Sequence, residues 1–304
     1  MGRIVVVGSY NVGMTIVGPE LPVPGQTVLG HTFDMGPGGK GSNQAIGAKR
    51  LGGDVTLVAK VGADVFGSDA RALFAREGLM GPGIMEADTH TGVGLILVDD
   101  RGGNMISVAA GANGLLIPDD LDRLPGLFDG TSHALCQLEC PPELFAGMAV
   151  RARASGATTI LNPAPARTLD DDIYGLVDIL TPNESELAVL TGLPTGEDQE
   201  VEAAARRLLE RGVGSAVVTL GERGAMWVGP ARSRRFPAFA VRARDTTGAG
   251  DAFNAGLVTA LASGASMEDA VALGCRAGAF CVTRIGVIDG LATREQLDAE
   301  VPPT

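Results

Sequence analysis

Short runs of β-branched residues recur along the chain, and most are followed by glycine and then by a stretch with helical spacing of apolar positions. Runs that are apolar throughout are typical of parallel strands buried on both faces. Alternation of strand and helix predicts right-handed crossovers and a three-layer α/β/α sandwich with a mostly parallel central sheet. The predicted strands are residues 4–7, 55–61, 133–139, 158–162, 178–181 and 216–220, and the predicted helices include 66–77, 143–155, 200–211 and 267–283.

Two segments break this pattern. Residues 12–37 are rich in glycine and proline with alternating apolar positions, and residues 92–109 look like two strands that turn at 99–104. We expect them to form a small separate sheet. Because the sequence shows no internal repeat and no long linker, we expect residues 1–304 to form one domain, with the small sheet as an extension of it.

Charge and composition exclude several classes of function. The net charge of −12 argues against electrostatic binding of nucleic acid or an anionic membrane over a broad surface. No apolar run approaches the length of a membrane span, so we expect a cytoplasmic protein. The four cysteines show neither zinc-ligand spacing nor a disulfide framework. The 44 glycines are about twice the usual share of roughly 7%, and they cluster in turns after apolar runs.

The strongest chemical signal is the stretch Asp245-Thr246-Thr247-Gly248-Ala249-Gly250-Asp251, which leads into a helical pattern. A helix N-terminus offers unpaired N–H groups and the positive end of the helix dipole, and glycines let an anion approach them. Asp251 would lie close enough to take a proton from a hydroxyl that attacks a phosphoryl group held there. The alternative is an aspartate that only caps the helix.

A second signal is Gly36-Pro37-Gly38-Gly39-Lys40-Gly41-Ser42-Asn43-Gln44-Ala45. A P-loop needs Ser or Thr directly after the lysine, and Gly41 stands there instead. Glycines at a helix start, with Lys40 and Asn43 pointing inward, suit a polyhydroxylated ligand, although a plain strand-to-helix turn would look similar. Gly8 and Gly13 lack the glycine spacing of a dinucleotide-binding fold, which disfavours a dehydrogenase.

Together, and in this order, these motifs resemble the PfkB family of carbohydrate kinases, and its ribokinase branch most closely. Residues 38–45 are similar to the N-terminal signature of that family and residues 245–253 to its C-terminal signature. Further segments that are similar to ribokinase sequence motifs are residues 137–139, 162–167, 181–186 and 219–224. The resemblance runs over nearly the whole chain, from about residue 3 to residue 300.

The resemblance implies a kinase that uses ATP and Mg²⁺ to phosphorylate a hydroxymethyl group of a small, ribose-like sugar. It also implies a β-sheet lid, formed by about 12–37 and 92–109, that closes over the sugar and often joins two copies in a dimer. It places Asp251 as the base beside an anion hole at Gly248, Ala249 and Gly250. The other implied sites are Asn11, Gly39, Lys40, Asn43 and Glu139 for the sugar; Asn183, Glu186, Thr219, Gly221 and Gly224 for the nucleotide and magnesium; and Asp245, Thr247, Cys281, Arg284 and Gly286 for a monovalent cation, K⁺.

The chain departs from the ribokinase pattern at two positions. Ribokinases usually carry an aspartate that binds sugar hydroxyls where this chain has Gly13, and a serine near the cation where it has Gly290. Loss of that aspartate removes a group that discriminates between sugars. Glu20 or Asp34 could replace it.

The alternatives to a ribose kinase therefore stay open. The acceptor could be another pentose, a deoxy or branched sugar, a polyol or a nucleoside, and a nucleoside would need an apolar or aromatic pocket, for which Tyr10 is the nearby candidate. A different class of protein, one that binds sugar or nucleotide without turnover, would keep the fold but not need an intact Asp251 and Glu186.

Overall fold

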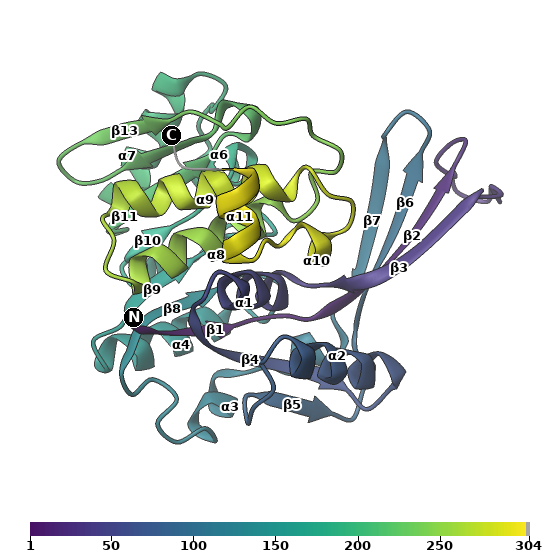
Figure 1. Cartoon of the computed structure of the whole chain (residues 1–304), viewed down its shortest axis with the longest axis horizontal. Helices are drawn as coiled ribbons and strands as arrows, with labels where there is room; N and C mark the ends of the chain where they lie inside the picture. The colour runs from purple at the N-terminus through teal and green to yellow at the C-terminus, as the bar shows by residue number, and fades with distance from the viewer. Residues whose placement is uncertain (302–304) are drawn as a thin grey trace.

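The structure is a computed structural model that describes residues 1–301, and it contains a large and a small β-sheet (Figure 1). Nine strands of the described residues form the large sheet in the order β13-β12-β11-β10-β9-β8-β1-β4-β5. Neighbouring strands from β5 to β11 run parallel, and β12 and β13 are antiparallel. The strands are β1 (Arg3–Val7), β4 (Asp54–Gly62), β5 (Ile84–Ala87), β8 (Thr131–Cys136), β9 (Thr158–Leu161), β10 (Ile179–Leu180), β11 (Ser215–Thr219), β12 (Ala225–Val228) and β13 (Ser233–Phe236).

Alternate side chains of β1 enter two different cores. Ile4 and Val6 belong to one, Val5 and Val7 to the other, and all four are completely buried. Helices α1, α2, α8, α9 and α11 cover the first face of the sheet, and α3, α4, α6 and α7 cover the second. The predicted three-layer sandwich is confirmed. The helices are α1 (Lys40–Arg50), α2 (Val65–Arg76), α3 (Pro118–Asp122), α4 (Glu143–Ala154), α5 (Asp171–Tyr174), α6 (Glu184–Thr191), α7 (Asp198–Glu210), α8 (Ala249–Ala262), α9 (Met267–Cys281), α10 (Val287–Gly290) and α11 (Arg294–Glu300), with short 3₁₀ helices η1 (Gly111–Leu115) and η2 (Gly221–Arg223).

The strand predicted at 133–139 ends earlier, at Cys136. The backbone then leaves the sheet, and the N–H of Leu138 bonds to the carbonyl of Ala164 in the next loop. This departure turns the side chains of Gln137 and Glu139 toward the N-terminus of α1, where both make hydrogen bonds. The early end of this strand therefore places two polar groups at the carboxyl edge of the sheet.

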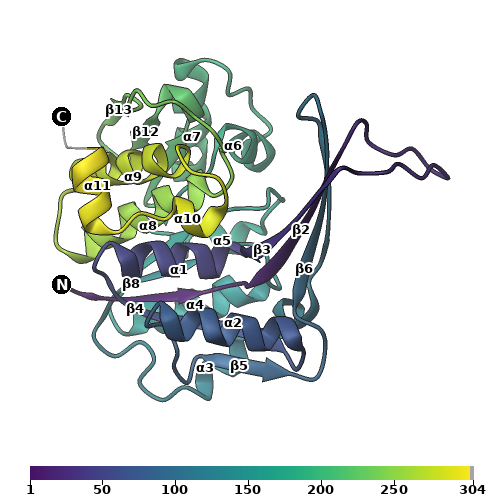
Figure 2. The ribbon, with the colours of Figure 1, turned by 45° about the vertical axis from the view of Figure 1, so that its right-hand side comes forward.

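The small sheet has the strand order β3-β2-β6-β7 and projects from the end of the body opposite the chain's N-terminus (Figures 1 and 2). Its central strands β2 and β6 are parallel, and each has an antiparallel neighbour at the edge. Strand β1 leads into β2, and β3 leads directly into α1. The small sheet is therefore joined to the body at Asn11 and at the glycines before Lys40. Its strands are β2 (Asn11–Gly18), β3 (Thr32–Gly38), β6 (Gly92–Asp99) and β7 (Asn104–Ala109).

Cys136, Cys140, Cys275 and Cys281 are buried as free thiols. Among residues 1–301, no helix combines the length and the apolar character needed to cross a membrane.

Candidate active site

Asp251 lies in the first turn of α8, but it does not cap the helix. The N-cap is Gly248, whose φ of 81° is left-handed, and a Cβ there would lie 2.8 Å from Cγ1 of Val287. Glycine is therefore required at 248 for both conformation and space. The Asp251 side chain, 6% exposed, accepts hydrogen bonds from Nδ2 of Asn43 at 2.8 Å and from Nε2 of Gln44 at 2.9 Å. The capping interpretation of Asp251 is wrong.

A buried chain of amides fixes this carboxylate. Nε2 of Gln44 also donates to Oδ1 of Asn162 at 3.0 Å, and Oε1 of Gln44 accepts from Nε2 of Gln137 at 2.7 Å. Asn162 in turn donates to the carbonyl of Thr181. We did not predict Gln44, Gln137 or Asn162 as site residues, although each lies inside a motif that the sequence analysis singled out. Since Gln44 uses its oxygen on Gln137 and its nitrogen on both Asn162 and Asp251, the Asp251 carboxylate has one defined orientation.

Lys40 starts α1 and lies among three carboxylates. Burial alone lowers the pKa of Lys40, but the charges of Asp251, Glu139 and Glu186 outweigh burial and raise it above its usual value. The N-cap of α1, Gly39, has no side chain, and Glu139 takes over the capping role by accepting the Lys40 N–H at 2.8 Å. Ser9 also donates to Glu139. The start of α1 is thus a positive centre held between acidic groups.

A polar cavity of about 160 Å³ brings much of the predicted site together. Glu186 lines it and is locked with Asn183 in a capping box at the start of α6, since each backbone N–H of the pair bonds to the other's side chain at 2.8 Å. Burial raises the pKa of the Glu186 carboxyl, and the Asn183 N–H and Lys40 offset this only in part. Other predicted residues that line this cavity are Lys40, Thr219, Gly248, Ala249, Gly250 and Asp251.

Three predicted residues of the nucleotide loop follow one another past β11. Thr219 pairs with Asn183 in an isolated bridge, which joins the ends of β10 and β11 at the cavity. Gly221 and Gly224 do not line the cavity; Gly221 is the first residue of η2 and Gly224 follows its last, with φ values of 54° and 92°. A Cβ at Gly224 would lie 2.2 Å from the carbonyl oxygen of Phe236, so only glycine permits this turn.

The residues predicted to hold a monovalent cation meet behind the start of α8. The Asp245 carboxylate accepts the N–H of Thr247 at 2.9 Å and the N–H of Gly286 at 3.0 Å. Burial raises the pKa of Asp245, but these hydrogen bonds outweigh it and hold the pKa below its usual value. The turn that follows α9 adjoins this loop, because the N–H groups of Arg244 and Asp245 bond to the carbonyl of Val282, whereas the Arg284 side chain points to Glu300.

Gly290, the second departure from the ribokinase pattern, has a steric reason. A Cβ at this position would lie 2.7 Å from Sγ of Cys281. The thiol of Cys281 donates weakly to the carbonyl of Thr247 at 3.5 Å. The sulfur therefore fills the space that a serine side chain would need.

Asn11 lies at the base of the small sheet, and its Oδ1 accepts a hydrogen bond from Nδ2 of Asn113 at 2.9 Å. Asn113 also pairs with both backbone groups of Tyr10. The sequence analysis missed Asn113, which only the fold brings beside β2. With its oxygen occupied, Asn11 presents its amide nitrogen as a donor.

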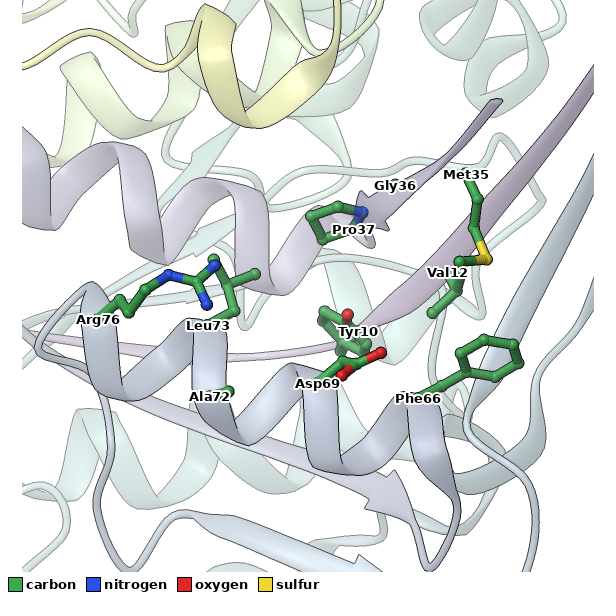
Figure 3. Close-up of a pocket in the computed structure, with 10 residues that line it drawn as sticks. All are labelled: Tyr10, Val12, Met35, Gly36, Pro37, Phe66, Asp69, Ala72, Leu73 and Arg76. Carbon is green, nitrogen blue, oxygen red and sulfur yellow. The ribbon is translucent and has the colours of Figure 1, made fainter. Parts of the chain in front are cut away.

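A second cavity, of about 260 Å³, lies between α2 and one face of the small sheet (Figure 3). Val12, Met35 and Pro37 line it from the sheet, and Phe66 lines it from the helix. Tyr10, the aromatic residue considered for binding a base, faces this cavity and packs edge-on against Phe74 (Figure 3). Burial, and next the charge of Asp69, raise the pKa of its hydroxyl to about 12. Tyr10 is thus turned away from Asp251.

Residues 1–294 match the family model described as "pfkB family carbohydrate kinase". The chain belongs to the PfkB family. It is 35% identical to the ribokinase of Haemophilus influenzae over 294 residues, which covers 96% of each chain, and 34% identical to the deoxyribokinase of Salmonella typhi over 97% of each. The solved structure of a ribokinase from Thermotoga maritima superposes with a TM-score of 0.90 at 34% identity, over 98% of this chain and 99% of that one.

Family and relatives make this protein an ATP-dependent sugar kinase of the ribokinase type, which uses a divalent cation. Among residues 1–301, no group of three or more His, Cys, Asp or Glu side chains could hold a metal by itself. The cavity instead offers Glu186, with one carboxylate oxygen free of the capping box, whereas the amide oxygen of Asn183 accepts from the Glu186 N–H and the Ser185 hydroxyl. A hard oxygen donor such as this Glu186 oxygen suits Mg²⁺ that arrives bound to phosphates.

Proposed function

We propose that the protein transfers the γ-phosphoryl group of ATP to the hydroxymethyl oxygen of a ribose-type pentose, with Asp251 as the general base. The observation that carries this proposal is the position of Asp251: its carboxylate is fixed by Asn43 and Gln44 at the rim of the cavity that the start of α8 lines. A base must be fixed within reach of the hydroxyl proton, and the amide chain provides that.

In the proposed step, the Asp251 carboxylate takes the proton of the attacking hydroxyl as the oxygen–phosphorus bond forms. The bond between the γ-phosphorus and the bridging oxygen breaks, and ADP leaves with the electron pair. The backbone N–H groups at the start of α8 face the cavity and stabilise negative charge on the transferring group. Lys40 adds a positive charge on the opposite side. Mg²⁺, when bound, neutralises charge on the β- and γ-phosphates.

The sugar would be held between donors and acceptors of the body. Oδ1 of Asn43 is buried and has no hydrogen-bond partner within residues 1–301. Since a buried acceptor without a partner costs free energy, it is suited to accept a hydrogen bond from a sugar hydroxyl. Glu139 supplies a second acceptor, and the Asn11 amide and Lys40 supply donors.

For K⁺, the proposed ligands are Asp245 and the carbonyls of Thr247, Cys281, Arg284 and Gly286. They are supported by the position of Asp245, whose carboxylate accepts the N–H of Thr247 in the loop before α8 and the N–H of Gly286 in the turn after α9. Because the same loop ends at Gly248, a bound cation would stabilise the anion-binding start of α8. The chain keeps carbonyl oxygens here even though Gly290 removes a hydroxyl.

We further propose that the small sheet is a lid, and that two copies join through its outer face. The register puts Met14, Met35 and Leu95 in one row and Ile16, Phe33, Leu97 and Met105 in the next, all on the same face. Five of these are exposed by 43 to 63% (Ile16, Phe33, Met35, Leu95 and Met105). A contiguous apolar face of this kind is typical of a protein interface. A kinase that consumes ATP is proposed to act in the cytoplasm.

A coupled assay of ADP release tests the catalytic proposal. Pentose-dependent turnover is expected for the wild type, and Asp251→Asn should lower kcat by about 100- to 10,000-fold, the usual contribution of a general base. Asp269→Asn is a matched control, because Asp269 holds the same third position in α9 far from the cavity. Pentose-dependent turnover that is absent from the wild type, or undiminished in Asp251→Asn, would contradict the proposal.

A further inference from the structure

Three glycines lie side by side across the small sheet. Gly13 of β2 pairs with Gly36 of β3 on one side and with Gly94 of β6 on the other. The next row on the same face, toward the body, contains Asn11 and Gly38. The glycine row therefore comes directly above the point where β3 passes into Gly39 and the start of α1.

The fold does not require glycine at these positions. None of the three has a positive φ. A Cβ at Gly13 would meet its nearest neighbour at 3.7 Å, which is ordinary contact, and a Cβ at Gly36 or Gly94 would meet nothing within 4 Å. Since glycine inside a strand weakens the sheet, its use without a local need indicates that a ligand approaches the backbone closely.

The glycine row belongs to the face that looks away from α2. Side chains alternate along a strand, and Val12, Met35 and Pro37, the neighbours of Gly13 and Gly36, line the cavity against α2 (Figure 3). The row shares its face with Asn11 and with Ile96, whose Cδ1 would lie 3.8 Å from a Cβ at Gly13. This is the face that continues toward Lys40 and the sugar-binding groups of the body.

The glycine row itself is bare and carries no side-chain polar group. Strands β2 and β6 are interior strands, so the ladder on both sides takes up their backbone N–H and C=O groups. No side chain within the glycine row replaces the missing carboxylate. Thr15 and Asp34 share this face but stand opposite each other one row farther from the body, roughly 7 Å away at the rise of a strand. Glu20 lies beyond β2, bonded to Gln26.

We propose that the acceptor is a pentose whose edge toward the small sheet carries hydrogen in place of a hydroxyl, that is, a deoxypentose. This rests on the proposed function. A hydroxyl pressed against the glycine row would lose its water and find no partner in that row, which disfavours binding of a sugar with a hydroxyl there. A C–H edge loses nothing there. The body side of the site binds hydroxyls, and the sheet side selects against them.

The test compares kcat/KM for ribose, 2-deoxyribose and a ribonucleoside in the wild type, Gly13→Asp and Gly13→Ala. We expect the wild type to use 2-deoxyribose at least as well as ribose. Gly13→Asp should raise the ratio of ribose to 2-deoxyribose by about tenfold or more, because the new carboxylate accepts hydroxyl protons. Gly13→Ala fills space without accepting a hydrogen bond and should leave the ratio unchanged.

A wild type that prefers ribose by more than about tenfold, a ratio that Gly13→Asp leaves unchanged, or a ribonucleoside used better than both pentoses would each overturn the inference. The proposed function has a separate failure: no acceptor-dependent ADP release from any of the three. That result would overturn both.

Discussion

Gln44 donates one hydrogen bond from Nε2 to Oδ1 of Asp251 at 2.9 Å, although 207 positions separate the two residues in the chain. The same nitrogen bonds to Asn162, and Gln137 holds the opposite end of the amide. Gln44 is therefore a positioning residue: it aims the base without reaching the sugar.

Replacing Gln44 by Met keeps the length of the side chain and removes the amide. We expect kcat to fall by about 10- to 100-fold, because a base displaced by a fraction of an ångström loses its alignment. KM for ATP should stay the same. Steady-state kinetics of Gln44→Met, Asp251→Asn and the double variant measure the effect. The two losses should not add, since Gln44 acts through Asp251; additive losses would show that Gln44 acts elsewhere.

Glu186 makes stability depend on pH in a defined direction. Burial holds its pKa above the usual 4.5 in the folded protein. The folded state thus binds the proton more tightly than the unfolded state, and the stability gained from Glu186 is complete below pH 4.5 and is lost as the pH rises through the folded pKa. Glu186→Gln should therefore match the wild type in urea unfolding at pH 4 and be more stable at pH 7.5.

The exposed Glu222, changed to Gln, is the control and should alter stability at neither pH. Glu186→Gln should also lower Mg²⁺-dependent turnover, so stability and activity move in opposite directions at pH 7.5. A variant that is less stable than the wild type at pH 7.5 would show that Glu186 stabilises the fold as an anion.

The pairing of Cys281 with Gly290 predicts a steric coupling. Gly290→Ser alone should lower the free energy of unfolding by about 1–3 kcal/mol, since its Cβ would overlap the Cys281 sulfur. Cys281→Ala should recover part of that loss when combined with it. Urea unfolding of both single variants and the double variant gives the coupling free energy. A coupling of zero would mean that the loop moves aside.

Asp245 should control the response to cations. KCl is expected to raise the activity of the wild type relative to choline chloride at equal ionic strength. Asp245→Asn should weaken this response, because the carboxylate supplies negative charge to the cation and holds the turn at Gly286 by a hydrogen bond. Activity of each protein titrated with KCl is the measurement. Equal activity of the wild type in the two salts would contradict the proposed K⁺ site.

The outer face of the small sheet should control assembly. Phe33→Glu places a charge at the β3 end of an exposed apolar row, and we expect it to convert a dimer into a monomer in light scattering after size exclusion. Leu29→Glu is the matched control, since Leu29 is 86% exposed but lies in the loop outside the strands. A wild type that is monomeric at all concentrations would remove the dimer proposal.

Several features of this protein follow from the sequence alone because they are local. The apolar runs predict the interior strands. The glycines before Asp251 predict a helix start that binds an anion, and those before Lys40 predict a helix start suited to a polyhydroxylated ligand. Strands β12 and β13 escaped prediction. Each has only four residues, and β13 contains the adjacent pair Arg234-Arg235, so neither shows a clear alternation. Pairing with β12 makes β13 a strand, and Asp198, which lies 37 positions away, binds the Arg235 side chain.

Only the tertiary structure decided which groups act on one another. The contacts of Gln44 with Asn162 and Asp251 join parts of the chain that are 118 and 207 positions apart, and no local pattern encodes them. The same holds for Gly13. The sequence shows that an aspartate is missing, but strand register alone brings Gly36 and Gly94 beside it, because side chains share a face only after the strands pair.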